Sequence, residues 1–116
     1  MPVSYENKIK DYIERNASDQ SINRGFSLWR NDHIRSITKT IKNTVQLTVL
    51  SSDHEREYLV DIGLNSQKQI ETFCNCPYDY GGICKHTVAG LLHCQSEGAL
   101  TSLFYSKKID PKNVTF

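Results

Sequence analysis

The sequence predicts an α+β domain with an N-terminal helix or helices, a small antiparallel sheet of three to four strands, a cysteine-rich hairpin and a C-terminal helix. Three observations predict this class. Apolar residues recur at helical spacing near the start, they alternate with polar residues in the middle, and a cluster of cysteine and histidine stands directly before a second helical pattern. The 116 residues suit one domain, which we expect over residues 1–100, followed by a tail or linker over residues 101–116.

A first helix is predicted over Ser4–Asn16, because its apolar residues follow the i, i+4, i+7, i+8 spacing of one helix face. These residues are Tyr5, Ile9, Tyr12 and Ile13. Ser4 is the expected N-cap, and the polar segment Ala17–Ser21 is expected to be a connection. Helical spacing then continues through a short second helix, in which Gly25 lowers the helix propensity. Its apolar residues are Ile22, Phe26 and Trp29.

The apolar period changes to two after the turn signal at Asn31-Asp32. Alternating apolar residues are Val45, Leu47 and Val49, and then Tyr58, Val60 and Ile62. The polar loop of residues 51–55 between the two runs predicts a hairpin. A strand is expected before it over Ile34–Thr40, and another after it over Lys68–Phe73. A C-terminal helix is expected from the spacing of Val88, Leu91, Leu92 and Gln95, with Gly98 just past its end.

Composition favours a soluble chain, since hydrophobic residues make up 38% of it and its mean hydropathy is −0.51. No apolar run approaches the roughly 18 residues of a membrane span, and the N-terminus lacks the pattern of a secretory signal. We therefore expect a cytoplasmic protein, nuclear if eukaryotic, with no membrane partner.

The net charge of +1 gives no global attraction to nucleic acid, but the charges are unevenly distributed along the chain. Residues 24–42 carry five cations and one carboxylate, Asp32, which is a local net charge of +4. Residues 43–71 have a local net charge of −3.

A metal site is predicted at residues 74–86, where three of the four cysteines stand with a histidine as C-x-C, a seven-residue loop and C-x-H. The expected ligands are Cys74, Cys76, Cys84 and His86. Three thiolates and an imidazole suit a tetrahedral Zn²⁺, and four protein ligands leave no open position, so one structural zinc ion is expected. Gly81-Gly82 permits the sharp turn that the loop needs.

Two alternatives stay open at this cluster: a disulfide, which a reducing cytosol disfavours, and iron or another metal. His93 and Cys94 are rival ligands, but in a helix Cys94 would lie about 12 Å along the axis from His86. Cys94 is therefore expected to be a core or surface cysteine. His33 and His54 stand in predicted turns and are expected to be solvated.

At these residues the chain resembles the SWIM zinc-finger family, whose pattern is C-x-C, a variable loop and C-x-H. The similarity covers Cys74-Asn75-Cys76-Pro77-Tyr78-Asp79, Gly82-Ile83-Cys84-Lys85-His86, Val88-Ala89 and Leu91-Leu92. The finger would span about residues 72–96, and a looser similarity to the SWIM region of bacterial SWI/SNF-type ATPases extends from about residue 22. The resemblance implies a strand, a hairpin loop and a helix, and a partner that is either DNA or protein.

The sequence thus favours a non-enzymatic zinc module that binds nucleic acid or recruits a partner, in association with a SWI/SNF-type DNA-translocating ATPase, of which it could be a part. The candidate contacts are cations and two aromatic residues: Arg24, Arg30, Arg35, Lys39, Lys42, Lys85, Tyr78 and Tyr80. The two tyrosines could stack on bases, or they could instead pack over the metal site. The alternative is a protein-interaction adaptor without nucleic-acid contact. No G-x-x-x-x-G-K-[ST] phosphate loop is present, so the chain cannot itself be the ATPase, and no small-molecule substrate is expected.

Overall fold

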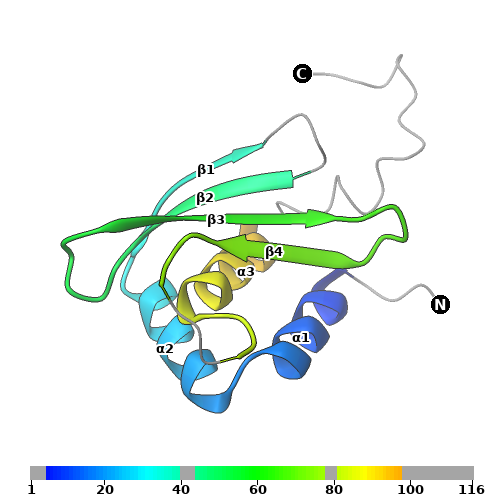
Figure 1. Ribbon diagram of the computed structural model, residues 1–116, viewed down its shortest axis with the longest axis horizontal. Helices are drawn as coiled ribbons and strands as arrows, with labels where there is room; N and C mark the ends of the chain where they lie inside the picture. Colours follow the sequence, from blue (N-terminus) through cyan, green and yellow to red (C-terminus); the bar gives the residue numbers. More distant parts are fainter. Residues whose placement is uncertain (1–4, 40–43, 78–80, 98–116) are drawn as a thin grey trace.

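The computed structural model describes residues 5–39, 44–77 and 81–97, which form a four-stranded antiparallel sheet with helices packed on one of its faces (Figure 1). The elements are α1 (Tyr5–Asn16), α2 (Asp19–Arg30), β1 (Ile34–Lys39), β2 (Thr44–Leu50), β3 (Glu57–Leu64), β4 (Ile70–Cys74) and α3 (Lys85–Glu97). The strand order is β1-β2-β3-β4, so each strand pairs with its neighbour in the sequence. The predicted α+β class is confirmed.

The hairpin of β2 and β3 supplies the sheet side of the core. Burial in β2 alternates strictly, with Val45, Leu47 and Val49 turned towards the helices. Their partners in β3 are Ile62, Val60 and Tyr58, respectively. Because directly paired residues of antiparallel strands share a face, the two alternating runs of the sequence form one apolar surface. The predicted hairpin is therefore confirmed, and the structure adds its register.

Helix α3 lies at the centre of the helical layer and is buried on most of its surface. Val88, Ala89, Leu91 and Cys94 are fully buried, because α3 contacts the sheet on one side and both other helices on the other. Helix α1 adds Ile9 and Ile13 to the same core, and α2 contributes the buried Leu28. The residue that follows Cys84 begins this central helix, so the metal-binding motif leads directly into the core.

Two elements begin at residues other than those predicted. The segment expected to be a connection contributes the first residues of α2, because Ser18 is an N-cap whose hydroxyl accepts a hydrogen bond of 3.1 Å from the amide of Ser21. The last strand begins at Ile70 rather than at Lys68, because Asn65 accepts hydrogen bonds from two backbone amides of the preceding turn. Ser4, Thr40 and Gly98 lie outside the described residues.

The prediction that His33 is solvated is wrong. His33 is only 6% exposed, and its Nδ1 lies 2.9 Å from the carbonyl oxygen of Leu50. The amide of Leu50 in turn donates to the carbonyl of His33, so the turn after α2 is fastened to the end of β2. The ring of His33 packs against that of His54, which is exposed as predicted. Long-range pairing of this kind has no local signal in the sequence.

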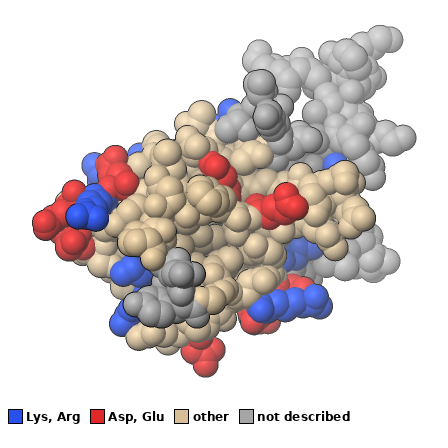
Figure 2. All heavy atoms as spheres, viewed as in Figure 1, with Lys and Arg blue, Asp and Glu red and all other residues tan. Residues whose placement is uncertain are grey.

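Charged groups are distributed unevenly over the surface. In the view of Figure 2, red carboxylate groups lie over the strands as well as at the hairpin end, whereas blue groups lie around the margin. The register assigns Glu57, Asp61 and Glu71 to the face of the sheet that the helices leave open. None of the described helices is long and apolar enough to cross a membrane.

Candidate metal centre

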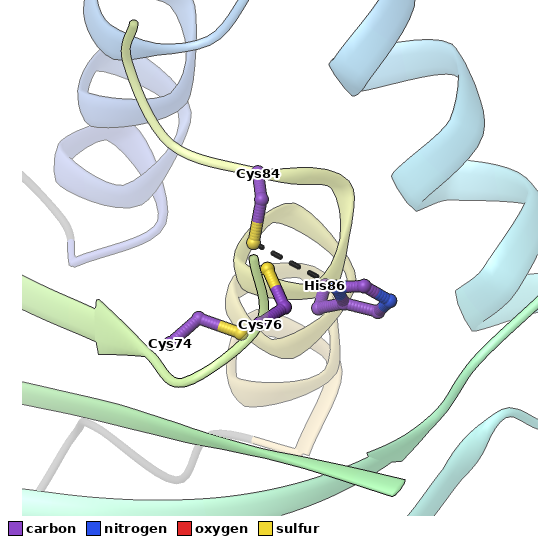
Figure 3. Close-up of side chains that lie close together, drawn as sticks. All are labelled: Cys74, Cys76, Cys84 and His86. Carbon is purple, nitrogen blue, oxygen red and sulfur yellow. Dashed lines mark hydrogen bonds between the residues drawn. The ribbon is translucent and has the colours of Figure 1, made fainter. Parts of the chain in front are cut away.

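The fold brings the four predicted metal ligands together from three segments (Figure 3). Cys74 ends β4, Cys76 lies in the turn that follows, Cys84 directly precedes α3, and His86 is in the first turn of α3. One ligand atom of each residue lies within 4.8 Å of those of the other three. In a tetrahedron with Zn–S bonds of about 2.3 Å the sulfurs would stand about 3.8 Å apart, so only small side-chain movements separate this arrangement from that geometry.

The turn that carries Cys76 is fastened to the sheet through Asn75. The side-chain oxygen of Asn75 accepts a hydrogen bond of 2.9 Å from the backbone amide of Leu59. The backbone amide of Asn75 in turn donates to the backbone carbonyl of Leu59. The side chain thereby continues the ladder of β3 and β4 beyond Cys74. This positions the C-x-C pair relative to β3.

The other pair is positioned by α1, a contact that the sequence does not signal. Gly81 and Gly82 both have positive φ angles, of 90° and 74°, as expected for the sharp turn before Cys84. The amide of Ile83 then donates a 2.8 Å hydrogen bond to the carbonyl of Asn16, the last residue of α1. A second tie joins Tyr12 of α1 to Thr72 of β4, whose hydroxyl oxygens lie 2.9 Å apart. Helix α1 thus contacts both segments that carry candidate ligands: the turn before Cys84 and the strand β4, which ends at Cys74.

His86 presents Nδ1 to the sulfurs. This atom lies 3.8 Å from the sulfur of Cys84, and the rest of the ring projects away from the three cysteines towards α2 (Figure 3). The ring packs against Tyr58, with centroids 4.7 Å apart, and its Nε2 is buried without a hydrogen-bond partner among the described residues. Both the direction and the burial of the ring favour Nδ1 as the metal ligand.

The thiols of Cys74 and Cys84 control each other's ionisation. A hydrogen bond from Cys74, aided by others from His86 and Thr87, lowers the pKa of Cys84 well below its ordinary value, against the effect of burial. The same hydrogen bond to Cys84, together with burial and the nearby charge of Cys84, raises the pKa of Cys74. A second negative charge in this cluster therefore needs a cation beside it. A divalent metal supplies that charge, so the donor set fits one zinc ion.

Cys94 takes no part in the cluster, as predicted. It is fully buried in the core beside Val88 and Leu91, and burial raises its pKa to about 12. His93, the other rival ligand, instead lines a shallow pocket with Phe26 and Trp29. The helical geometry of α3 therefore separates these residues from the metal ligands, as the spacing implies.

Of the predicted contact residues, the structure brings Arg24 of α2 and Lys85 of α3 to one place. Both line two adjoining pockets beside the metal ligands, which together we call the zinc-side groove. Arg30 lies elsewhere, with its guanidinium over the ring of Phe26 at 5.7 Å from the centroid. Arg35 and Lys39 are exposed on the edge strand β1. Lys42, Tyr78 and Tyr80 lie outside the described residues.

Sequence reasoning missed the polar residues that complete the zinc-side groove. These are Gln20, Ser27 and Asn31 of α2 and its C-cap, and Ser51, Ser52, Asp53 and His54 of the loop between β2 and β3. The ammonium group of Lys85 donates a 2.8 Å hydrogen bond to the hydroxyl of Ser52, which joins the finger to this loop. The polar composition of residues 51–55 predicted only that this loop lies at the surface. It did not predict that the loop contacts the groove beside α2.

Residues 58–95 match the family model of the SWIM zinc finger. Comparison with curated proteins and with solved structures gave no significant match. The matched segment begins at β3 rather than at residue 72, and it contains β4, all four candidate ligands and most of α3. The segment that matches the SWIM zinc finger, residues 58–95, therefore holds the cluster of Cys74, Cys76, Cys84 and His86, which is suited to one zinc ion.

Proposed function

We propose that this chain is a non-catalytic module in which one structural zinc ion supports a groove that binds the phosphate backbone of nucleic acid. The observation that carries the proposal is the convergence of Arg24 and Lys85 on the zinc-side groove from two different helices. Its two pockets have volumes of about 770 and 590 Å³, which is the size range of ligand sites in proteins.

The chemistry of the groove favours phosphate. Arginine and lysine are the main phosphate ligands in proteins, and among the described residues neither Arg24 nor Lys85 forms an ion pair that would compete. The hydroxyl of Ser52 and the amide of Gln20 add donors of the kind that contact phosphate oxygens. The carboxylates of Glu57, Asp61 and Glu71 lie on the opposite face of the sheet, so an anionic strand would be directed to the groove.

One residue of the groove opposes an anion. Asp53 lies in its wall, and a hydrogen bond from the side chain of Ser51, followed by one from the amide of Glu55, lowers the pKa of its carboxyl group. Asp53 is therefore ionised at neutral pH and offsets one of the two cations. We expect weak binding without sequence preference, with a dissociation constant in the micromolar range or above.

The zinc ion would act on this groove through the chain itself. Lys85 stands between the ligands Cys84 and His86, and Cys76 lines the groove as well. Ligation of these neighbours would hold the backbone of Lys85 in place and with it one of the two cations. Four protein donors leave no open position for a substrate or water, which supports a structural rather than a catalytic metal.

The resemblance to the SWIM region of bacterial SWI/SNF-type ATPases supports a role beside a DNA-translocating ATPase, in the cytoplasm of a bacterium or in the nucleus of a eukaryote. In that setting the ATPase would supply movement along DNA, and this module would add a weak contact to the backbone. The weak affinity expected from one net cation suits such an auxiliary contact, because a partner that must slide cannot be held tightly.

Fluorescence anisotropy with a labelled DNA oligonucleotide tests the proposal on the zinc-loaded full chain. Binding should be detectable at low salt and should weaken as salt rises, with a slope of about −0.9 for each phosphate contacted. The double variant Arg24→Glu with Lys85→Glu should lose binding while it keeps one zinc ion per chain. Asp53→Asn should bind more tightly than the unmodified chain, because it removes the opposing charge.

The matched control is Arg35→Glu with Lys39→Glu, which makes the same change of charge on β1, away from the groove. It should keep most of the affinity. Loss of binding in this control, with binding retained in the groove variant, would move the contact to the edge strand. Absence of any binding at low salt would leave the protein-interaction adaptor as the function of this chain.

A further inference from the structure

The face of the sheet that the helices leave open carries two large exposed apolar residues. Leu59 is 41% exposed and Phe73 is 62% exposed, which is the largest value among the exposed large apolar side chains of the described residues. Both point away from the helices, since their neighbours Val60 and Cys74 pair on the inner face. Phe73 pairs with Asp61, so Leu59 and Phe73 are diagonal neighbours on adjacent strands and within reach of each other.

Carboxylates surround this apolar pair. By register, Asp61 lies beside Phe73 in the next strand, Glu57 lies two residues before Leu59 on the same face, and Glu71 lies two residues before Phe73. Asp61 accepts a 2.9 Å hydrogen bond from Gln46, and Glu71 accepts one of 3.3 Å from Asn65. These positions of β3 and β4 hold no lysine or arginine. We call the surface of Leu59, Phe73, Glu57, Asp61 and Glu71 the acidic sheet face.

We infer that the acidic sheet face docks a protein segment in which apolar side chains alternate with lysine or arginine. The exposed pair of Leu59 and Phe73 supplies the apolar contact, and the three carboxylates select a cationic partner by charge complementarity. The acidic sheet face is turned away from the helices, whereas Arg24 and Lys85 of the zinc-side groove belong to α2 and α3, so this inference does not depend on nucleic-acid binding.

The same charges decide against two other occupants. Nucleic acid would bring phosphates against Glu57, Asp61 and Glu71, which repel them. A second copy of the chain docked face to face would bring six carboxylates together without an intervening cation, and like charges across an interface are unfavourable. A basic segment relieves the repulsion among the three carboxylates and covers the apolar pair in one step.

The test is a ¹⁵N-NMR titration of the zinc-loaded full chain with a twelve-residue peptide of alternating lysine and leucine. The amides of Leu59, Asp61 and Phe73 should shift, and those of Arg24 and Lys85 in the groove should not. Phe73→Ser should weaken binding about tenfold, the scale expected for an aromatic residue at the centre of an interface. The matched control is Phe26→Ser, which alters another exposed aromatic residue, 44% exposed on α2, and should bind as the unmodified chain does.

Two further peptides separate the apolar contact from simple charge attraction. A peptide of alternating lysine and serine should bind about tenfold more weakly than the leucine peptide, and one of alternating glutamate and leucine should not bind. Equal binding of the lysine–serine peptide, an unchanged affinity in Phe73→Ser, or shifts confined to the groove would each overturn the inference. None of these outcomes alters the DNA titration, which reports on the opposite face.

Discussion

Gly25 of α2 lies directly against Val88 of α3, because a Cβ atom placed on Gly25 would stand 2.5 Å from the Cβ of Val88. It would also stand 2.8 Å from the carbonyl oxygen of Lys85. Both distances are too short for real atoms, so glycine is what lets α2 approach the central helix this closely. The residue that lowers the helix propensity of α2 thus determines the distance between the two helices.

Replacement of Gly25 by alanine should therefore destabilise the protein, although alanine gains about 1 kcal/mol of helix propensity. Overpacking of a tight core contact typically costs 1–3 kcal/mol, roughly, so a net loss of up to about 2 kcal/mol is expected. Urea unfolding of the zinc-saturated protein measures it. Asn23→Ala is the matched control on the exposed side of α2 and should be neutral or stabilising. A more stable Gly25→Ala protein would show that the helices do not pack this closely.

The double glycine of the finger offers a second matched pair. Alanine at Gly81 meets no atom of the described residues within 4 Å, whereas alanine at Gly82 collides with the carbonyl of Asn16. Both substitutions place a side chain at a positive φ, which costs about 1–2 kcal/mol. Only Gly82→Ala also displaces Asn16 from the amide of Ile83. We expect Gly82→Ala to bind zinc more weakly than Gly81→Ala in competition with a chromogenic chelator, and equal affinities would contradict the contact with α1.

Metal analysis should find one zinc ion per chain in the unmodified protein. Cys84→Ala should lose it, because the sulfur of Cys84 is within reach of every other ligand atom of the cluster. Structural zinc contributes on the order of 10 kcal/mol of apparent binding free energy, so circular dichroism should also show loss of folded structure. Cys94→Ala should keep one zinc ion despite the small cavity it leaves in the core. Equal loss of zinc in the two variants would mean that Cys94 is a ligand.

The burial of Cys94 predicts a dependence of stability on alkaline pH. Its pKa is about 12 in the folded protein against an ordinary value of 9.0, so between these values the unfolded chain releases a proton that the folded chain retains. The free energy of unfolding should therefore fall as pH rises from about 9 to about 12. Cys94→Ala should show a shallower fall over the same range in urea titrations. Identical pH profiles would indicate that the thiol reaches solvent in the folded state.

The class of fold and the ligand set were accessible from local patterns. Two alternating runs ending in a polar loop predict the β2–β3 hairpin, because the period of apolar residues follows from the geometry of a pleated strand. The C-x-C and C-x-H pairs predict a metal cluster, because few other sites need so many soft donors in thirteen residues. The starts of α2 at Asp19 and of β4 at Ile70 were harder to predict from the sequence, since each depends on hydrogen bonds to one side chain, that of Ser18 or of Asn65.

The sequence by itself thus determined the elements and the metal chemistry, which depend on neighbours within a few residues of one another. Only the tertiary structure decided that α1 braces the finger through Asn16, that His33 is buried against Leu50, and that Arg24 meets Lys85 across a groove. It also decided that Phe73 of β4 remains outside the core, paired with Asp61 of β3. Each of these depends on residues far apart in the chain, whose contact follows from how the helices pack on the sheet and leaves no periodic signal.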